Sequence, residues 1–300
     1  MKESLARLRG TVGLWSSSHE DVPAGSAAVR VAEAEGYGFS AYWFPESWFR
    51  ESLTSATMLL AGTQRLTIAT GITSIWGRDA VSSLSAARTL NAAFADRFVL
   101  GLGVSHSPLV ERLRAQAYDH PYDKMKSYLE LMDSARSLSP EADHPYARVL
   151  AALGPRMLTL AGTHADGAHT YLVTPAHTAV ARERLGTGFL AVEQAVVVAP
   201  TREEFLERAH RHLEFYTGLE NYRANWRRLG LTENDFVKGG SEALCDAMVV
   251  HERGDGDALR RRVDEHRRAG ADHVCLQVLY PPSESPAEAW RGCADMLSLA

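Results

Sequence analysis

Cysteine is scarce in this sequence. The three cysteines among 300 residues, Cys245, Cys275 and Cys293, lie far apart and form no CxxC pair. This spacing suits neither a disulfide framework nor a thiolate zinc site. We therefore expect three buried free thiols and no bound metal.

Long apolar runs are also lacking. No stretch of 18 apolar residues occurs, so no segment reads as a membrane-spanning helix. The first ten residues, MKESLARLRG, carry positive charge but no apolar core of the kind found in secretory signal peptides. These absences predict a cytoplasmic protein that does not enter membranes.

An excess of positive charge is missing as well. Lys and Arg total 32 against 37 Asp and Glu, which gives a formal net charge of −5. Such a chain creates no broad basic field that would attract nucleic acid or an anionic membrane surface. Walker loops, HExxH motifs and serine elbows are absent too. The partner that we expect is a small molecule.

The chain does contain short apolar runs that alternate with helical patterns, which is typical of βα units and a parallel sheet. The predicted strands are 11–14, 41–44, 66–71, 98–101, 149–152, 167–171, 194–198 and 273–278. The predicted helices are 24–34, 47–60, 81–95, 122–137, 155–161 and 175–185. Eight strands in one domain over residues 1–300 predict an α/β fold, a (β/α)8 TIM barrel.

Two features refine this prediction. Residues 199–268 exceed one crossover helix, so we expect extra helices between the seventh and eighth strands. A doubly wound fold is the alternative, but it needs a glycine-rich fingerprint after an early strand. The nearest match, residues 101–106, has His106 in place of the third glycine.

Loops that follow the early strands combine aromatic and polar residues. Trp15, Trp48 and Trp76 lie in three successive loops, which meet at one rim if the fold is a barrel. An apolar aromatic pocket with a few polar groups suits a planar ring ligand. The alternative is that these tryptophans only pack the loops.

Two further loops favour an anionic ligand. Gly101 and Gly103 permit close backbone approach after the fourth strand, where serine hydroxyls follow. After the fifth strand, Gly154 precedes Pro155, a preferred first residue of a helix, and helix N-termini bind phosphate. The alternative for this segment is an ordinary helix start.

Carboxylates and histidines give weaker signals. Glu46 follows the second strand beside aromatics, where it either exchanges a proton with substrate or holds a loop. His210 and His212 lie two apart on a predicted helix, so their rings diverge and do not share a metal. His169, near the sixth strand, is expected to be a surface or capping residue.

In combination, these segments resemble the luciferase-like monooxygenase superfamily, specifically its actinobacterial branch of F420-dependent oxidoreductases. The resemblance rests on TVGLWSSSHE (11–20), YWFPESWFRES (42–52), LTIATGITS (66–74) and RFVLGLGVSHSPLVERL (97–113). Segments 120–133, 150–178 and 269–279 follow in the order of that branch.

This resemblance implies a bacterial luciferase-like TIM barrel with insertions, a homodimer, and coenzyme F420 or FMN at the carboxyl-terminal rim. Hydride transfer would pass through the cofactor ring, which a cis peptide between Gly71 and Ile72 would back. The phosphate end would lie at residues 103–107 and 151–154. The implied cofactor contacts are Trp15, Gly71, Ile72, Gly103, Val104, Ser105, His106, Ala151, Ala152, Leu153 and Gly154.

The chain departs from the family at one position, because a histidine that some relatives carry after the second strand is replaced here by Ser47. We expect Glu46 or His106 to exchange the proton instead. Trp48, Trp76 and Arg78 are the expected substrate contacts, and Arg50, Arg78 and Arg156 the expected positive rim. The alternatives to an F420-dependent enzyme are an FMN-dependent monooxygenase and a non-catalytic barrel that binds a flavin-like molecule.

Overall fold

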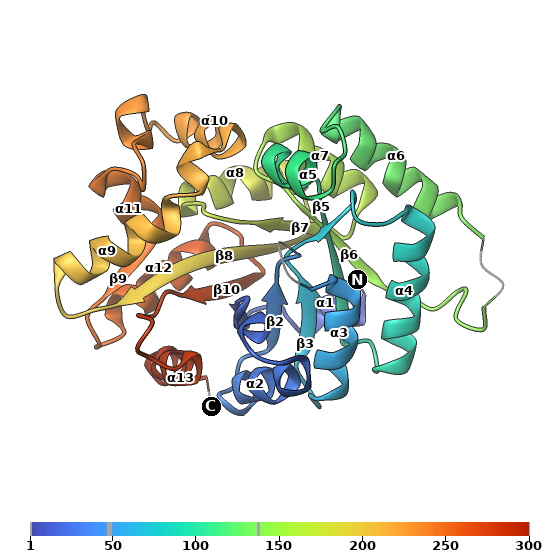
Figure 1. Ribbon diagram of the computed structural model, residues 1–300, viewed down its shortest axis with the longest axis horizontal. Coiled ribbons are helices and arrows are strands. Elements are labelled where there is room, and N and C mark those ends of the chain that lie inside the picture. The colour runs from blue at the N-terminus through green and yellow to red at the C-terminus, as the bar shows by residue number, and fades with distance from the viewer. Residues whose placement is uncertain (1, 47–49, 137–138, 300) are drawn as a thin grey trace.

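Eight parallel strands close into a barrel in the computed structural model, which describes residues 2–46, 50–136 and 139–299 (Figure 1). The barrel strands are β1 (Val12–Trp15), β2 (Ala41–Phe44), β3 (Thr67–Thr70), β5 (Phe98–Gly103), β6 (Ala147–Ala151), β7 (Gly167–Thr170), β8 (Phe189–Val198) and β10 (His273–Val278). Strand β10 pairs with both β8 and β1, which completes the ring. The closed ring confirms the predicted TIM barrel and excludes the doubly wound alternative.

Helices cover the outside of the barrel (Figure 1). They are α2 (Ala24–Gly36), α3 (Ser52–Ala61), α4 (Ala80–Ala93), α5 (Ser107–Leu113), α6 (Pro121–Ser134), α7 (Pro155–His164), α8 (Pro175–Leu185), α12 (Asp257–Arg268) and α13 (Pro286–Leu297). The six predicted helices correspond to α2, α3, α4, α6, α7 and α8; α8 matches at both ends, and the other ends are shifted by at most five residues. Helices α5 and α13 were missed.

Two strands were also missed. Strand β4 (Thr73–Ser74) pairs with β5, and β9 (Val249–Glu252) pairs with the end of β8. Strand β4 has only two residues, too few for a residue pattern to show it, and β9 lies within the segment 199–268, where we expected only extra helices. Pairing with β5 and β8 makes these segments strands. Strand β8 begins at Phe189 rather than at residue 194, because its first half pairs with β7 and β10 inside the barrel wall.

The segment between β8 and β10 forms a side layer. It contains α9 (Arg202–Leu213), η2 (Tyr216–Gly218), α10 (Glu220–Arg228), η3 (Glu233–Phe236) and α11 (Glu242–Met248), followed by β9 and α12. Figure 1 shows α9, α10 and α11 together at one side of the barrel, beside β8 and β9. Trp226 is fully buried at the centre of a hydrophobic cluster of this layer.

The barrel interior is closed at the end opposite the site. The short N-terminal helix α1 (Glu3–Ala6) places Leu5, and the turn after it Leu8, against interior residues such as Trp43 and Val99. All four side chains are buried. No helix in the described ranges combines the length and apolar character that crossing a bilayer requires.

Contact between neighbouring strands depends on glycine at Gly101. A Cβ placed there would lie 1.8 Å from the carbonyl oxygen of Thr70 on the adjacent strand. We predict that Gly101→Ala lowers the free energy of unfolding by about 3 kcal/mol, because the wall must shift to admit the methyl group. Gly25→Ala is the control, since its Cβ would meet nothing within 4 Å. Chemical denaturation of both variants would check this, and equal stabilities would contradict it.

Candidate active site

A cavity of about 530 Å³ opens at the carboxyl ends of the strands. Every residue that the resemblance implied as a cofactor contact lines it. These are Trp15, Gly71, Ile72, Gly103, Val104, Ser105, His106, Ala151, Ala152, Leu153 and Gly154. Parallel strands end at the same rim of a barrel, so contributions from β1, β3, β5 and β6 converge there.

The floor of the cavity is built from backbone and apolar side chains. The peptide bond between Gly71 and Ile72 is cis, as the resemblance implied. The Trp15 indole Nε1 donates a hydrogen bond to the Gly71 carbonyl oxygen at 3.2 Å. A Cβ on Gly103 would lie 2.4 Å from Ile72 Cγ1, so glycine at this position makes room for the Ile72 side chain. The result is a mainly apolar surface.

One end of the cavity suits an anion. Helix α7 begins after Gly154, no side chain caps its first amides, and Leu153, Gly154 and Met157 line the cavity there. Arg228 of α10 also lines it, and within the described residues its guanidinium makes no ion pair. A free helix N-terminus beside a cation favours a phosphate or carboxylate.

The carboxylate of Glu46 is fully occupied by protein donors. Its Oε1 accepts from Arg78 at 2.7 Å and from Arg114 at 3.2 Å. Its Oε2 accepts from Arg78 at 2.9 Å, the Ser74 amide at 2.9 Å and the Ser52 hydroxyl at 3.2 Å. Because five donors saturate the two oxygens, Glu46 borders the cavity but offers no free lone pair to a substrate. These hydrogen bonds favour the alternative that Glu46 holds a loop over the proton exchange expected for it.

The expected substrate contacts Arg78 and Trp76 do not line the cavity. Arg78 is half-buried and pairs with Glu46 and Glu51. Trp76 is buried, and its Nε1 donates to the Val104 carbonyl oxygen at 2.9 Å. A local sequence pattern could not predict these positions, because both side chains bond residues far away along the chain and so do not face the cavity. Trp48 lies outside the described residues.

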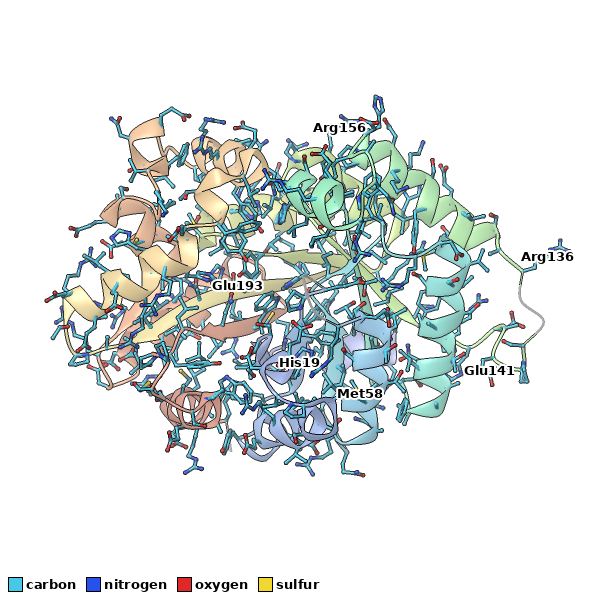
Figure 2. All side chains as sticks on the ribbon, in the orientation of Figure 1. His19, Met58, Arg136, Glu141, Arg156 and Glu193 are labelled. Atoms are coloured by element: carbon cyan, nitrogen blue, oxygen red, sulfur yellow. The ribbon has the colours of Figure 1, made fainter. Side chains whose placement is uncertain are left out.

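The structure also corrects the prediction that Arg50, Arg78 and Arg156 form a positive rim around the cavity. Arg50 donates to the carbonyl oxygens of His19 and Val22, which fixes a loop. Arg156 is exposed and lies over the ring of Tyr122, 4.1 Å from its centre (Figure 2). The cation that reaches the cavity is Arg228, whose position in the side layer the sequence did not reveal.

His106 lies at the cavity surface, immediately before α5. Its ring packs 5.8 Å from the ring of Tyr222 and 6.1 Å from that of Phe215, measured between centroids. Burial lowers the pKa of His106 to about 4, so its imidazole is neutral at neutral pH. Neutral imidazole donates one hydrogen bond and accepts another.

An aromatic wall that sequence reasoning missed closes the other side. Tyr216 and Tyr222 come from the side layer and Tyr171 from the end of β7, and all three line the cavity. The Tyr216 hydroxyl donates to the Tyr171 hydroxyl at 3.0 Å, which donates to Gln277 Oε1 at 2.7 Å. These aromatics were visible in the sequence, but no spacing linked them to the rim.

The expectation for His169 was wrong. It lies on β7 in the barrel interior, 2% exposed, and stacks on Trp43 with 4.8 Å between ring centroids. Both ring nitrogens lack hydrogen-bond partners within the described residues, and the ring lines the cavity floor. Burial, with His273 nearby, lowers the pKa of His169 to about 3.

A buried carboxyl group lies on the neighbouring strand. Glu193 of β8 is 1% exposed and lies near the centre of the molecule (Figure 2). Its Oε2 accepts from the Leu172 amide at 2.9 Å, whereas Oε1 has no partner in the described part of the chain. Burial raises the pKa of Glu193 to about 8, so this carboxyl is mostly protonated at neutral pH. The sequence pattern gave no sign of it.

Comparisons with known proteins agree on the family and the fold of this chain. A family described as luciferase-like monooxygenase matches residues 10–273. The chain is 24% identical to a protein of Mycobacterium tuberculosis strain H37Rv named as a coenzyme F420-dependent oxidoreductase, Rv3520c, over 86% of this chain and 91% of that protein.

Two solved structures share the fold. An F420-dependent secondary alcohol dehydrogenase in complex with an F420–acetone adduct superposes with a TM-score of 0.74 at 13% identity, over 97% of this chain and 99% of that one. The oxygenating component of a Pseudomonas putida diketocamphane monooxygenase in complex with FMN gives 0.66 at 14% identity, over 96% of each chain.

The saturated carboxylate of Glu46 leads to a stability prediction. Glu46→Leu leaves the buried Arg78 guanidinium without its bidentate partner, so we expect the free energy of unfolding to fall by about 3 kcal/mol. Asp246→Leu, which removes an exposed partner of Arg202, is the control and should cost less than about 1 kcal/mol. Urea denaturation measures both. Equal stabilities for the Glu46 variant and the parent protein would refute the role of Glu46 in holding the loop.

A second prediction concerns acid stability. The folded-state pKa of His169, about 3, lies below its ordinary value of 6.5, so the unfolded chain binds the proton first. The free energy of unfolding therefore decreases as the pH falls below 6.5. At about pH 4, the contribution of His169 to this decrease is roughly 3 kcal/mol. His169→Phe keeps the stacking on Trp43 and should flatten the dependence. Exposed His120→Asn is the control, and an unchanged slope in His169→Phe would contradict the assignment.

Proposed function

Because the chain belongs to the luciferase-like monooxygenase family, we propose that it is an oxidoreductase that transfers a hydride between coenzyme F420 and a small organic substrate. The cavity carries this proposal, since it joins an apolar surface to an anion-binding end. The choice of F420 rests on the mycobacterial relative, which matches 86% of the chain and is named for that coenzyme.

The residues present fit such a cofactor. Trp15 and Ile72 offer apolar surface to a ring, and glycine at Gly103 leaves room for the Ile72 side chain that forms part of that surface. The first amides of α7 and the Arg228 guanidinium would bind a phosphate group. When bound, F420 supplies a site that gives or accepts a hydride, and the protein supplies binding and orientation.

The polar groups of the cavity define what the protein contributes to the reaction. We propose that neutral His106 forms a hydrogen bond with the reacting oxygen of the substrate, because Glu46 has no free lone pair. Tyr222 and Phe215 pack beside His106 and exclude water from it. Glu46 acts indirectly, by holding Arg78 and Arg114 behind the cavity wall.

Three broader expectations remain part of the proposal. We propose that residues 1–300 form one domain, that the protein is a homodimer, and that it resides in the cytoplasm. The family resemblance supports the dimer, and the sequence composition supports the location. Size-exclusion chromatography with light scattering would determine the oligomeric state.

A fluorescence titration with F420 and, under the same salt, with FMN tests the cofactor. We expect micromolar or tighter F420 binding and weaker FMN binding. Arg228→Gln should weaken F420 binding about tenfold, because it removes one charged hydrogen bond to the anionic part of the coenzyme. Arg227→Gln is the matched control, since the neighbouring Arg227 pairs with Glu220 and Glu233 outside the cavity.

The other results of the titration have definite meanings. A preference for FMN would replace the proposal with an FMN-dependent monooxygenase, which the likeness to an FMN-bound structure makes the second candidate. Tight F420 binding without turnover of any alcohol or carbonyl compound would favour a non-catalytic binding barrel. Binding of neither compound would refute the proposed function.

A further inference from the structure

A second lobe of about 260 Å³ adjoins the main cavity. The two share Trp15, Ser17, His212 and Gln277 in their walls, so they meet at the ends of β1 and β10. The other residues of the lobe are Ser16, Ser18, Arg208, Arg211, Val278, Leu279 and Tyr280. Tyr171 of the aromatic wall packs against Trp15 and His212 and donates to Gln277, so a ligand that spans the two spaces would pass beside Tyr171.

The lobe differs from the main cavity in its chemistry. Two arginines of α9 line it, and none of its lining residues is Asp or Glu. Arg208 Nη1 donates to the Val198 carbonyl oxygen at 3.0 Å, which fixes the guanidinium in place. Arg208 Nη2 forms a long ion pair with half-exposed Glu204 at 3.8 Å, too far for a hydrogen bond, and the Arg208 side chain is only 13% exposed. A fixed, largely buried cation thus keeps donor capacity.

Other donors around the lobe are also unused. Within the described residues, Gln277 Nε2 and the Ser17 hydroxyl donate to no protein acceptor, whereas Gln277 Oε1 already accepts from Tyr171. The Nε2 atom of His212 is buried without a partner at the junction of the two spaces. Arg211 pairs with Glu207 at 2.6 Å, but that pair is exposed and therefore weak. Of these groups only His212 Nε2 is a buried atom, whereas Gln277 and Ser17 are half-buried. A buried ring nitrogen without a protein partner, beside two donors that bond no protein acceptor, indicates a place for a polar ligand group.

We infer that this lobe binds a carboxylate of the substrate, whose apolar remainder lies in the main cavity against the aromatic wall. The inference rests on the proposed function, and it specifies the substrate class as a carboxylic acid with an aromatic or branched apolar body. One fixed guanidinium with neutral donors matches a monoanion better than a phosphate dianion. The phosphate-binding helix end of α7 lies among the loops after β6, whereas this lobe lies at β1 and β10.

Calorimetric titration of the full-length protein with 3-phenylpropionate and with 3-phenylpropanamide tests this inference. The two probes have the same shape and differ in charge. We expect the acid to bind at least tenfold more tightly than the amide, in the absence of F420 and with F420 at saturation. Because the first titration needs no cofactor, its outcome does not depend on whether the F420 proposal holds.

Substitutions of the two arginines test which cation recognises the carboxylate. Arg208→Gln should abolish the preference for the acid, and Arg208→Lys, which keeps the cation, should retain part of it. Arg211→Gln should reduce the preference about threefold, and the pair with Glu207 that it removes is exposed and therefore contributes little to stability. Arg202→Gln is the matched control on the same helix, because Arg202 pairs with Asp246 and Glu242 and lines neither space. Thermal melting of each variant checks folding, and Arg208→Lys and Arg211→Gln carry the test if Arg208→Gln does not fold.

Three results would overturn the inference. Equal binding of acid and amide would show that the lobe does not recognise charge. Displacement of 3-phenylpropionate by millimolar inorganic phosphate would assign the lobe to a phosphate group instead. A loss of F420 affinity in Arg208→Gln as large as the loss of 3-phenylpropionate affinity would show that the lobe holds the coenzyme.

Discussion

Closure of the barrel between β8 and β10 is the constraint on which the site depends. Six residue pairs, from His273 with Ala191 to Val278 with Val196, join these strands, and β10 then pairs with β1. Closure brings the carboxyl ends of strands separated by more than 250 residues to one rim. Trp15 of β1 and Gln277 of β10 can therefore line the same cavity.

The side layer gives this rim its particular chemistry. Strand β8 is long enough that its last residues pair with β9 beyond the barrel wall, and the helices between them fold back over the cavity. Arg208, His212, Tyr222 and Arg228 all come from this layer. The barrel supplies the floor, one helix N-terminus and Tyr171, whereas the insertion supplies the rest of the aromatic wall and the cations. We therefore expect substrate preference to depend on the insertion more than on the strands.

Burial keeps several ionisable groups near the cavity neutral. Desolvation lowers the pKa of His106 and His169 and raises that of Glu193, so all three are mainly uncharged at neutral pH. The charged groups are instead paired behind the wall, as Glu46 is with Arg78, or placed at the edges, as Arg228 and Arg208 are. This division leaves an apolar centre for a ring and charged ends for anions.

The sequence by itself determined seven of the eight barrel strands to within two residues, because the alternation of strand and helix patterns is local. The number of strands favoured the barrel over a doubly wound fold, and the family resemblance implied the cavity residues at the strand ends. Only the tertiary structure decided the role of Glu46, since Arg78 and Arg114, its partners, lie 32 and 68 residues away along the chain. The same holds for β9, which is a strand because β8 pairs with it. Burial, pairing and the direction of a side chain depend on contacts between distant segments, and no local pattern contains them.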